Sequence, residues 1–215
     1  MIVIVTAMDK EYDLISEWIA KNWLDYKNVQ NIALIKSGIG KVNAASCLTE
    51  FLSSNTSSKV TRVISVGCAG AAVAGLKSGN VVIGNSYCYH DVYCGEPNAN
   101  GQVQGMPAVF PSDFSWIDMD ERFRLGTIAT GDKFVTTREQ VLAIKDFLPN
   151  SYNVCAIDME SAALAQVCYK KGIGFTSIRV ISDNPLEPNQ TEQYAGFWDS
   201  LAEKACSCLL YTSPS

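Results

Sequence analysis

The sequence predicts a three-layer α/β/α fold with a central twisted, mostly parallel or mixed sheet. Several short runs are almost continuously apolar, which is typical of strands buried on both faces of a sheet. Helical patterns lie between many of these runs, and this alternation indicates βαβ units. The chain has 215 residues, 47% of them hydrophobic, so we expect one well-buried domain over residues 1–215.

Seven runs are predicted to be strands: Ile2–Ala7, Ile32–Lys36, Val60–Val66, Val81–Tyr89, Leu125–Thr130, Cys155–Ile157 and Phe175–Ile181. Four segments have helical periodicity: Glu11–Trp23, Val42–Leu52, Glu139–Phe147 and Ser161–Lys171. Gly172 follows two lysines and is expected to end the last of these helices. From Tyr93 to Ser115 the pattern breaks into a segment rich in proline and glycine, which predicts a long functional loop.

Composition and charge exclude several classes of protein. The net charge is −5 with no stripe of Lys and Arg, so we expect no nucleic-acid partner bound through its phosphates. Met1–Ala7 is apolar but short and lacks a basic leader, which favours a first strand over a signal peptide or a membrane span. Eight cysteines without a Cys-x-x-Cys pair favour reduced thiols in a cytoplasmic protein. Cys88 and His90 share a strand face, but their spacing matches no familiar zinc pattern, and we expect no metal.

Glycines and carboxylates follow the predicted strands, where an open α/β sheet binds its ligands. They are Glu11, Gly38, Gly40, Gly67, Gly70, Asp91, Asp132, Asp158, Glu160 and Asp183. Each acid has an ordinary structural alternative: Glu11 and Glu160 could complement helix dipoles, and Asp183 could make an Asx turn. The glycine segments match neither a dinucleotide-binding nor a Walker motif. The prediction of carboxylate chemistry therefore depends on the whole set.

Taken in order, seven short segments resemble one family of enzymes. They are Ala7–Glu11, Ala33–Val42, Gly67–Gly70, Tyr89–Asp91, Thr130–Val135, Asp158–Glu160 and Ile181–Asp183. Together they resemble the 5′-methylthioadenosine/S-adenosylhomocysteine nucleosidases of the nucleoside phosphorylase/nucleosidase superfamily, over residues 2 to 184. The resemblance implies hydrolysis of the N-glycosidic bond of an adenine thionucleoside, with no metal or redox cofactor.

The resemblance also implies roles for the acids. Glu11 matches the family's acid that activates the attacking water, and Glu160 matches the one that holds the ribose hydroxyls. Asp183 matches the aspartate that protonates purine N7 and binds the exocyclic amine. Breaking the C–N bond leaves a cationic ribosyl group and an adenine anion, so a carboxylic acid with a raised pKa is needed at the base. Two carboxylates divide the work in the same way in glycoside hydrolysis.

The remaining positions are implied as substrate contacts. Met159 matches a methionine that packs on the sugar, and Phe134 and Val135 match the segment that stacks on the base. Met8 and Ile39 would line the site. An aromatic residue, Tyr194 or Phe197, would close over the ligand.

Two features depart from the family pattern. Cys68 stands where a serine is usual, which replaces a hydroxyl by a weaker thiol donor. The segment Asn22–Asn31 is short, so we expect an early β-hairpin to be trimmed or lost.

Three alternatives remain open. A purine nucleoside phosphorylase would bind phosphate with arginines, one of them just before the glycine-rich turn. Here Ser65 and Val66 precede that turn, and Arg62 lies too far back, which favours water as the nucleophile. The other two alternatives are a hydrolase of another 5′-modified nucleoside and a non-catalytic nucleoside-binding protein.

The loop around Met106–Pro107 suggests a homodimer, because family members complete the 5′ pocket with a loop from the partner.

Overall fold

The computed structural model describes residues 1–22, 32–54, 59–187 and 197–210, without the side chains of residues 199–200 and 207–210. The strands are β1 (Ile2–Thr6), β2 (Ile32–Lys36), β3 (Arg62–Ala71), β4 (Val81–Tyr89), β5 (Phe110–Pro111), β6 (Phe123–Thr130), β7 (Val154–Asp158) and β8 (Gly174–Asp183). The α-helices are α1 (Asp9–Asn22), α2 (Lys41–Ser53), α3 (Arg138–Phe147), α4 (Ser161–Lys171) and α6 (Trp198–Leu210), with a short 3₁₀ helix at Asn150–Tyr152.

The strands form one mixed sheet. β1 lies between β2 and β3 and is parallel to both. β3 also pairs in parallel with β8, β4 with β6, and β6 with β7. Two antiparallel junctions, β4 with β8 and β3 with β7, close these five strands on themselves. The predicted mixed α/β fold is confirmed, but the sheet is partly closed, whereas the sequence analysis assumed an open one.

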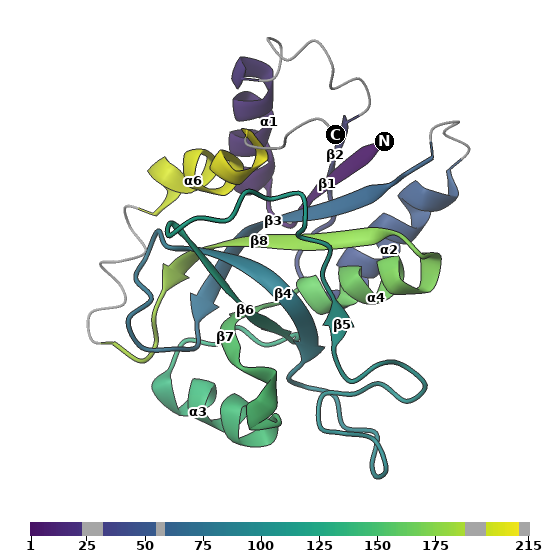
Figure 1. Ribbon diagram of the computed structural model, residues 1–215, viewed down its shortest axis with the longest axis vertical. Helices are drawn as coiled ribbons and strands as arrows, with labels where there is room; N and C mark the ends of the chain where they lie inside the picture. The colour runs from purple at the N-terminus through teal and green to yellow at the C-terminus, as the bar shows by residue number, and fades with distance from the viewer. Residues whose placement is uncertain (23–31, 55–58, 188–196, 211–215) are drawn as a thin grey trace.

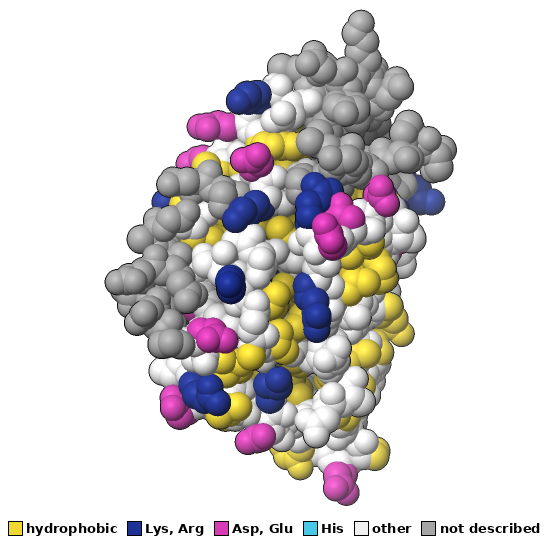
Figure 2. Space-filling view, turned by 60° about the vertical axis from the view of Figure 1, so that its left-hand side comes forward, with side chains coloured by type: hydrophobic (Ala, Val, Ile, Leu, Met, Phe, Trp, Pro, Cys, Tyr) yellow, Lys and Arg dark blue, Asp and Glu magenta, His cyan; other side chains and the backbone are white. Residues whose placement is uncertain are grey.

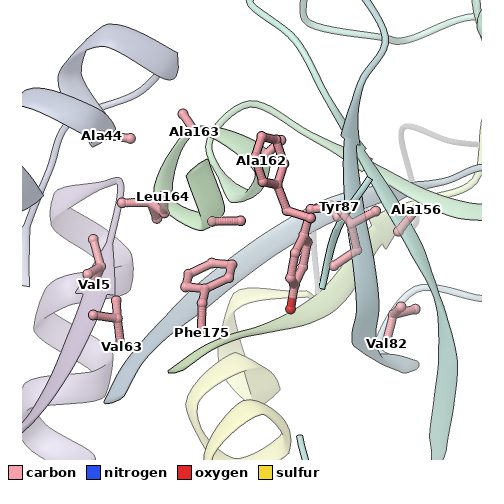
Figure 3. Packing of buried hydrophobic residues seen from close by; sticks show 14 of the residues in the cluster. Val5, Ala44, Val63, Val82, Tyr87, Ala156, Ala162, Ala163, Leu164 and Phe175 are labelled. Atoms are coloured by element: carbon pink, nitrogen blue, oxygen red, sulfur yellow. The ribbon is translucent and has the colours of Figure 1, made fainter. Parts of the chain in front are cut away.

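Helices cover both sides of the sheet (Figure 1). α2 and α4 pack together on one side, and α1 and α6 pack together on another, with α3 beyond the ends of β6 and β7. Each of these three sets of helices, α2 with α4, α1 with α6, and α3, packs on its own cluster of buried apolar side chains. In the cluster beneath α4, the rings of Tyr87 and Phe175 meet edge to face with centroids 4.9 Å apart, close to Leu164 (Figure 3).

The four predicted helices occur close to their predicted bounds, and α4 has them unchanged. Its C-terminal residue is followed by Gly172 at φ +65°, whose N–H bonds to Cys168 and Tyr169 carbonyls, which is the glycine stop that the sequence predicts. The long loop contains the short strand β5, and α6 was not predicted. None of the described helices is long and apolar enough to cross a bilayer.

One local prediction is wrong. The sequence predicts a turn at Gly67–Gly70, but this segment continues β3 to Ala71. A Cβ on Gly67 would lie 2.7 Å from Oε1 of Glu11, closer than real Cβ atoms approach. Gly67 therefore lets α1 bring a carboxylate against the strand, and the glycine reflects close approach rather than a turn.

Candidate active site

A cleft opens where β1, β3, β7 and β8 end. The structure brings most of the predicted residues to its walls: Met8, Glu11, Ile39, Cys68, Phe134, Val135, Met159, Glu160 and Asp183. Phe197 is not among the residues that line it. That side chain is 2% exposed and packs in the cluster between α1 and α6, so its predicted contact with a ligand is not supported. Tyr194 and most of Asn22–Asn31 lie outside the described residues.

Glu11 is fixed by backbone donors in the segment after β1 and in β3. Its Oε2 accepts N–H groups of Ala7 at 3.0 Å and Met8 at 3.1 Å, and its Oε1 accepts the N–H of Cys68 at 3.0 Å. The side chain is 2% exposed. Glu11 does lie in the first turn of α1, as the helix-dipole alternative requires. Its link to Cys68 in β3, however, is a contact that a dipole partner does not need.

Glu160 precedes α4 but does not cap it. Its Oε1 accepts the N–H of Gly40 at 2.9 Å, and the α4 N-terminus is instead capped by Asp158, which accepts the N–H of Ser161. Asp158, and not Glu160, is therefore the acid that complements the dipole of α4. Burial, followed by the charge of Asp158, raises the pKa of Glu160 to about 7, while Arg179 and the Gly40 N–H oppose that rise.

Arg179 is the counter-charge of the site, and the sequence analysis did not single it out. It is 2% exposed within β8, donates from Nε to Asp158 at 2.8 Å and from Nη2 to the hydroxyl of Ser65 at 2.9 Å. Thr130 adds a 2.6 Å hydrogen bond to Asp158. Burial disfavours the charge of Arg179, but Asp158, Glu160 and Glu11 outweigh it and raise the pKa. An arginine inside a run predicted to be a buried strand is the available signal, because a buried charge must be paired.

Asp183 is the last residue of β8, at a bulge. Ala69 pairs with Ile181 and Gly70 with Asp183, so Ser182 is the extra residue. Such bulges often re-aim side chains beside active sites. Ser182 donates its hydroxyl to Asp183 at 2.5 Å, and burial raises the pKa of Asp183. The turn that follows is made by Asn184, whose Oδ1 accepts the N–H of Leu186, so the Asx alternative does not describe Asp183.

The mouth of the cleft is apolar. Phe134 is 72% exposed and Ile39 is 50% exposed, whereas Val135 below them is buried. An exposed aromatic beside a cleft is typical of a ligand contact rather than of core packing. Burial and the charge of Glu11 raise the pKa of Cys68, so its thiol is neutral.

The alternatives for metal and nucleic acid find no support among the described residues. His90 is buried with its ring against Gly131, Cys88 is fully buried, and no three described His, Cys, Asp or Glu side chains are grouped to hold a metal. On the face in Figure 2, Lys and Arg are scattered among acidic and apolar side chains rather than joined in a basic stripe. Arg62 donates to Asp113 at 3.1 Å at the far end of β3.

Known proteins with similar sequences and folds share this architecture. The family model of the phosphorylase superfamily matches residues 1–212. A 5′-methylthioadenosine/S-adenosylhomocysteine nucleosidase of Bacillus cereus is 40% identical over 162 residues, covering 71% of this chain and 68% of the relative.

Two solved structures of proteins with that name superpose on the chain. The enzyme of Neisseria meningitidis, in complex with methylthio-immucillin-A, has a TM-score of 0.81 and 29% identity, covering 98% of this chain and 97% of that one. The enzyme of Streptococcus pneumoniae, with the transition-state inhibitor MT-ImmA, has a TM-score of 0.80 and 27% identity at the same coverage.

Proposed function

The chain belongs to the phosphorylase superfamily and, within it, to the 5′-methylthioadenosine/S-adenosylhomocysteine nucleosidases, and from that premise we propose its reaction. The chain hydrolyses the N-glycosidic bond of 5′-methylthioadenosine and S-adenosylhomocysteine, releasing adenine and the 5-thioribose product. One observation carries the proposal: Glu11, Glu160 and Asp183 converge on a single cleft with an aromatic residue at its mouth.

Asp183 is the proposed acid for the leaving group. The C–N bond electrons move to adenine, which leaves as an anion unless a proton reaches it. Burial favours the protonated form of Asp183, and a proton passed to purine N7 makes adenine a neutral leaving group. The hydroxyl of Ser182 holds the carboxyl in place. Phe134, exposed at the mouth, supplies a face on which the purine stacks.

Glu160 and Glu11 act on the sugar and on water. Glu160 accepts hydrogen bonds from the ribose hydroxyls, with Met159 packed against the sugar, and its negative charge favours the cation that develops. Glu11 takes a proton from water as the oxygen bonds to C1′. One proton leaves water and one reaches adenine, so the reaction balances as a hydrolysis.

The cleft favours water over phosphate as the nucleophile. Its buried charges are Glu11, Asp158 and Glu160 against Arg179, and the guanidinium of Arg179 already donates to Asp158 and Ser65. A phosphate dianion entering beside these carboxylates would be repelled. Arg62, at the start of β3, is paired with Asp113.

We further propose a cytoplasmic homodimer with one nucleosidase domain per chain. Six cysteines are free thiols: Cys47, Cys68, Cys88, Cys94, Cys155 and Cys168. Free thiols suit a reducing compartment. Val42, the second residue of α2, is 77% exposed and follows Ile39 of the cleft mouth by three residues in the chain. We infer that an apolar surface continues from the cleft to the start of α2. A partner covering this surface would complete the 5′ end of the site. A fully active monomer would contradict the dimer.

A substrate panel tests the proposal. Purified chain is incubated with 5′-methylthioadenosine, S-adenosylhomocysteine and 5′-deoxyadenosine, each with and without phosphate, and free adenine is measured. Adenine release from the first two, at equal rates in both buffers, is expected. Release that requires phosphate would indicate a phosphorylase, and tight binding without release would indicate a nucleoside-binding protein.

A further inference from the structure

Three side chains outside the cleft link the loops that form its rim. Lys41 donates from Nζ to both oxygens of Asp91, at 2.8 and 2.7 Å. Asp91 accepts the backbone N–H of Asp132 at 2.9 Å, and Asp132 accepts the backbone N–H of Lys41 at 2.8 Å. We call Lys41, Asp91 and Asp132 the rim clasp. None of the three is among the residues that line the cleft.

The rim clasp sits directly beside a group that holds Glu160. The N–H donated to Glu160 belongs to Gly40, the residue before Lys41. Gly40 has φ +96°, and a Cβ there would lie 3.0 Å from Oδ1 of Asp132. Only a glycine accepts both this φ and this approach without strain. The backbone that carries the Gly40 N–H is held by the next residue, because the N–H of Lys41 donates to Asp132 at 2.8 Å.

The clasp also replaces a missing helix cap. Gly40 is the N-cap of α2 and makes no side-chain cap, and the first turn of α2 contains no acidic residue. Asp132 comes from the loop after β6, and its carboxylate accepts the N–H of the first helical residue. A carboxylate at that position satisfies a free donor and complements the helix dipole. α2 is thus anchored through Asp132 to the segment that continues into Phe134 and Val135.

We propose that the rim clasp positions Glu160 for the reaction, with Asp91 as its central residue. Asp91 neutralises Lys41 and holds the Asp132 backbone, which keeps the Gly40 N–H aimed at Glu160. The inference rests on the proposed function for its kinetic consequence, but its structural part concerns the free protein. Lys41, Asp91 and Asp132 are positioning residues and are not expected to contact substrate.

The test compares Asp91→Ala with a matched control, Asp113→Asn. The pair of Arg62 and Asp113 has side-chain exposures of 27% and 36%, similar to 22% and 28% for Lys41 and Asp91, and it lies at the opposite end of β3. At a temperature where all variants are folded, Asp91→Ala should lower kcat for 5′-methylthioadenosine about tenfold and change KM less. The kcat effect is expected because the hold on the ribose strengthens in the transition state. Asp91→Asn, which keeps one acceptor oxygen, should fall between wild type and Asp91→Ala.

Hydrogen exchange of the Gly40 amide in ligand-free protein gives the second measurement. Asp91→Ala should exchange this amide faster than wild type and Asp113→Asn, because its acceptor Glu160 is no longer aligned. Equal kcat and equal Gly40 exchange in Asp91→Ala and Asp113→Asn would overturn the proposal. If wild type releases no adenine, the proposed function fails, and the Gly40 exchange still decides whether the clasp positions Glu160.

Discussion

Two arginine–aspartate pairs show how environment changes the use of one interaction. Arg179, in the middle of β8, pairs with Asp158 at the end of β7 beneath the cleft, which we call the cleft end. Arg62, at the start of β3, pairs with Asp113 at what we call the opposite end. At the cleft end, the side chains of Arg179 and Asp158 are 2% and 1% exposed, and Asp158 also accepts hydrogen bonds from Thr130 and Ser161. At the other end, the side chains of Arg62 and Asp113 are 27% and 36% exposed. Charges are costly to bury unless they are fully paired. Burying Arg179 and Asp158 therefore costs folding free energy that the fold alone does not require.

The buried pair has a consequence for the chemistry of the cleft. The buried guanidinium allows three carboxylates to stand close together beneath one cleft, and the pKa of Glu160 is raised to about 7 by burial and by Asp158. Perturbed acids of this kind concentrate at functional sites. The partly exposed pair at the other end joins the loop after β5 to the start of β3, and neither residue lines the cleft. We therefore expect substitutions at the cleft end to change activity and stability strongly, and substitutions at the other end to change little.

The largest expected effect is on catalysis at the cleft end. Asp183→Asn keeps the shape of the side chain but cannot donate the proton, so kcat should fall at least about a thousandfold. Circular dichroism and thermal melting should be close to wild type. Near-normal adenine release by this variant would remove Asp183 from the reaction.

The next effect is on stability. Asp158→Asn leaves the charge of Arg179 buried beside a neutral amide and should lower the free energy of unfolding by about 3 kcal/mol. Urea denaturation followed by tryptophan fluorescence measures this. A loss below about 1 kcal/mol would mean that Glu160 and Glu11 can compensate Arg179 alone.

Glu160→Gln should stabilise the fold while it impairs the reaction. In the folded chain Glu160 titrates near 7, above its ordinary value of 4.5, so the stability tied to its neutral form is present below pH 4.5 and lost as pH rises through 7. Glutamine stays neutral and still accepts the Gly40 N–H. The variant should exceed wild type by about 2 kcal/mol at pH 8 and match it at pH 4.5, as measured by denaturation at both pH values. A smaller difference at pH 8 than at pH 4.5 would reverse the sign of this linkage.

The smallest effect is expected at the opposite end. Asp113→Asn removes a partly exposed ion pair and should lower stability by less than about 1 kcal/mol, with kcat and KM unchanged. Thermal melting at low and at high salt would test this, because a screened pair loses its contribution as salt rises. A large loss would show that this pair is more than a surface contact.

The same two ends explain what the sequence could and could not reveal. Glu11, Glu160 and Asp183 follow predicted strands, and a site at strand ends follows from α/β architecture. Arg179 does not stand out in the sequence, because it lies within a buried strand and its partner Asp158 is 21 residues away. The closure of the sheet depends on the pairing of β3 with β7 through only two residue pairs. So short a pairing produces no periodic pattern in the sequence.

Three further features of the structure differ from, or are absent from, what the local sequence predicts. Gly67 was assigned to a turn, yet it sits in β3 to admit the carboxylate of Glu11. The rim clasp joins residues 41, 91 and 132, and the spacing of these residues along the chain does not predict their contacts. Phe197 was proposed as a ligand contact by resemblance, but α1 and α6 bury it between them.

The most direct measurement is adenine release in phosphate-free buffer by wild type and by Glu11→Gln. Glu11 is held by three backbone N–H groups at the cleft, and glutamine cannot take a proton from water. Wild type should release adenine from 5′-methylthioadenosine without phosphate, and Glu11→Gln should not. Activity that appears only when phosphate is added, or that survives in Glu11→Gln, would contradict hydrolysis with Glu11 as the base.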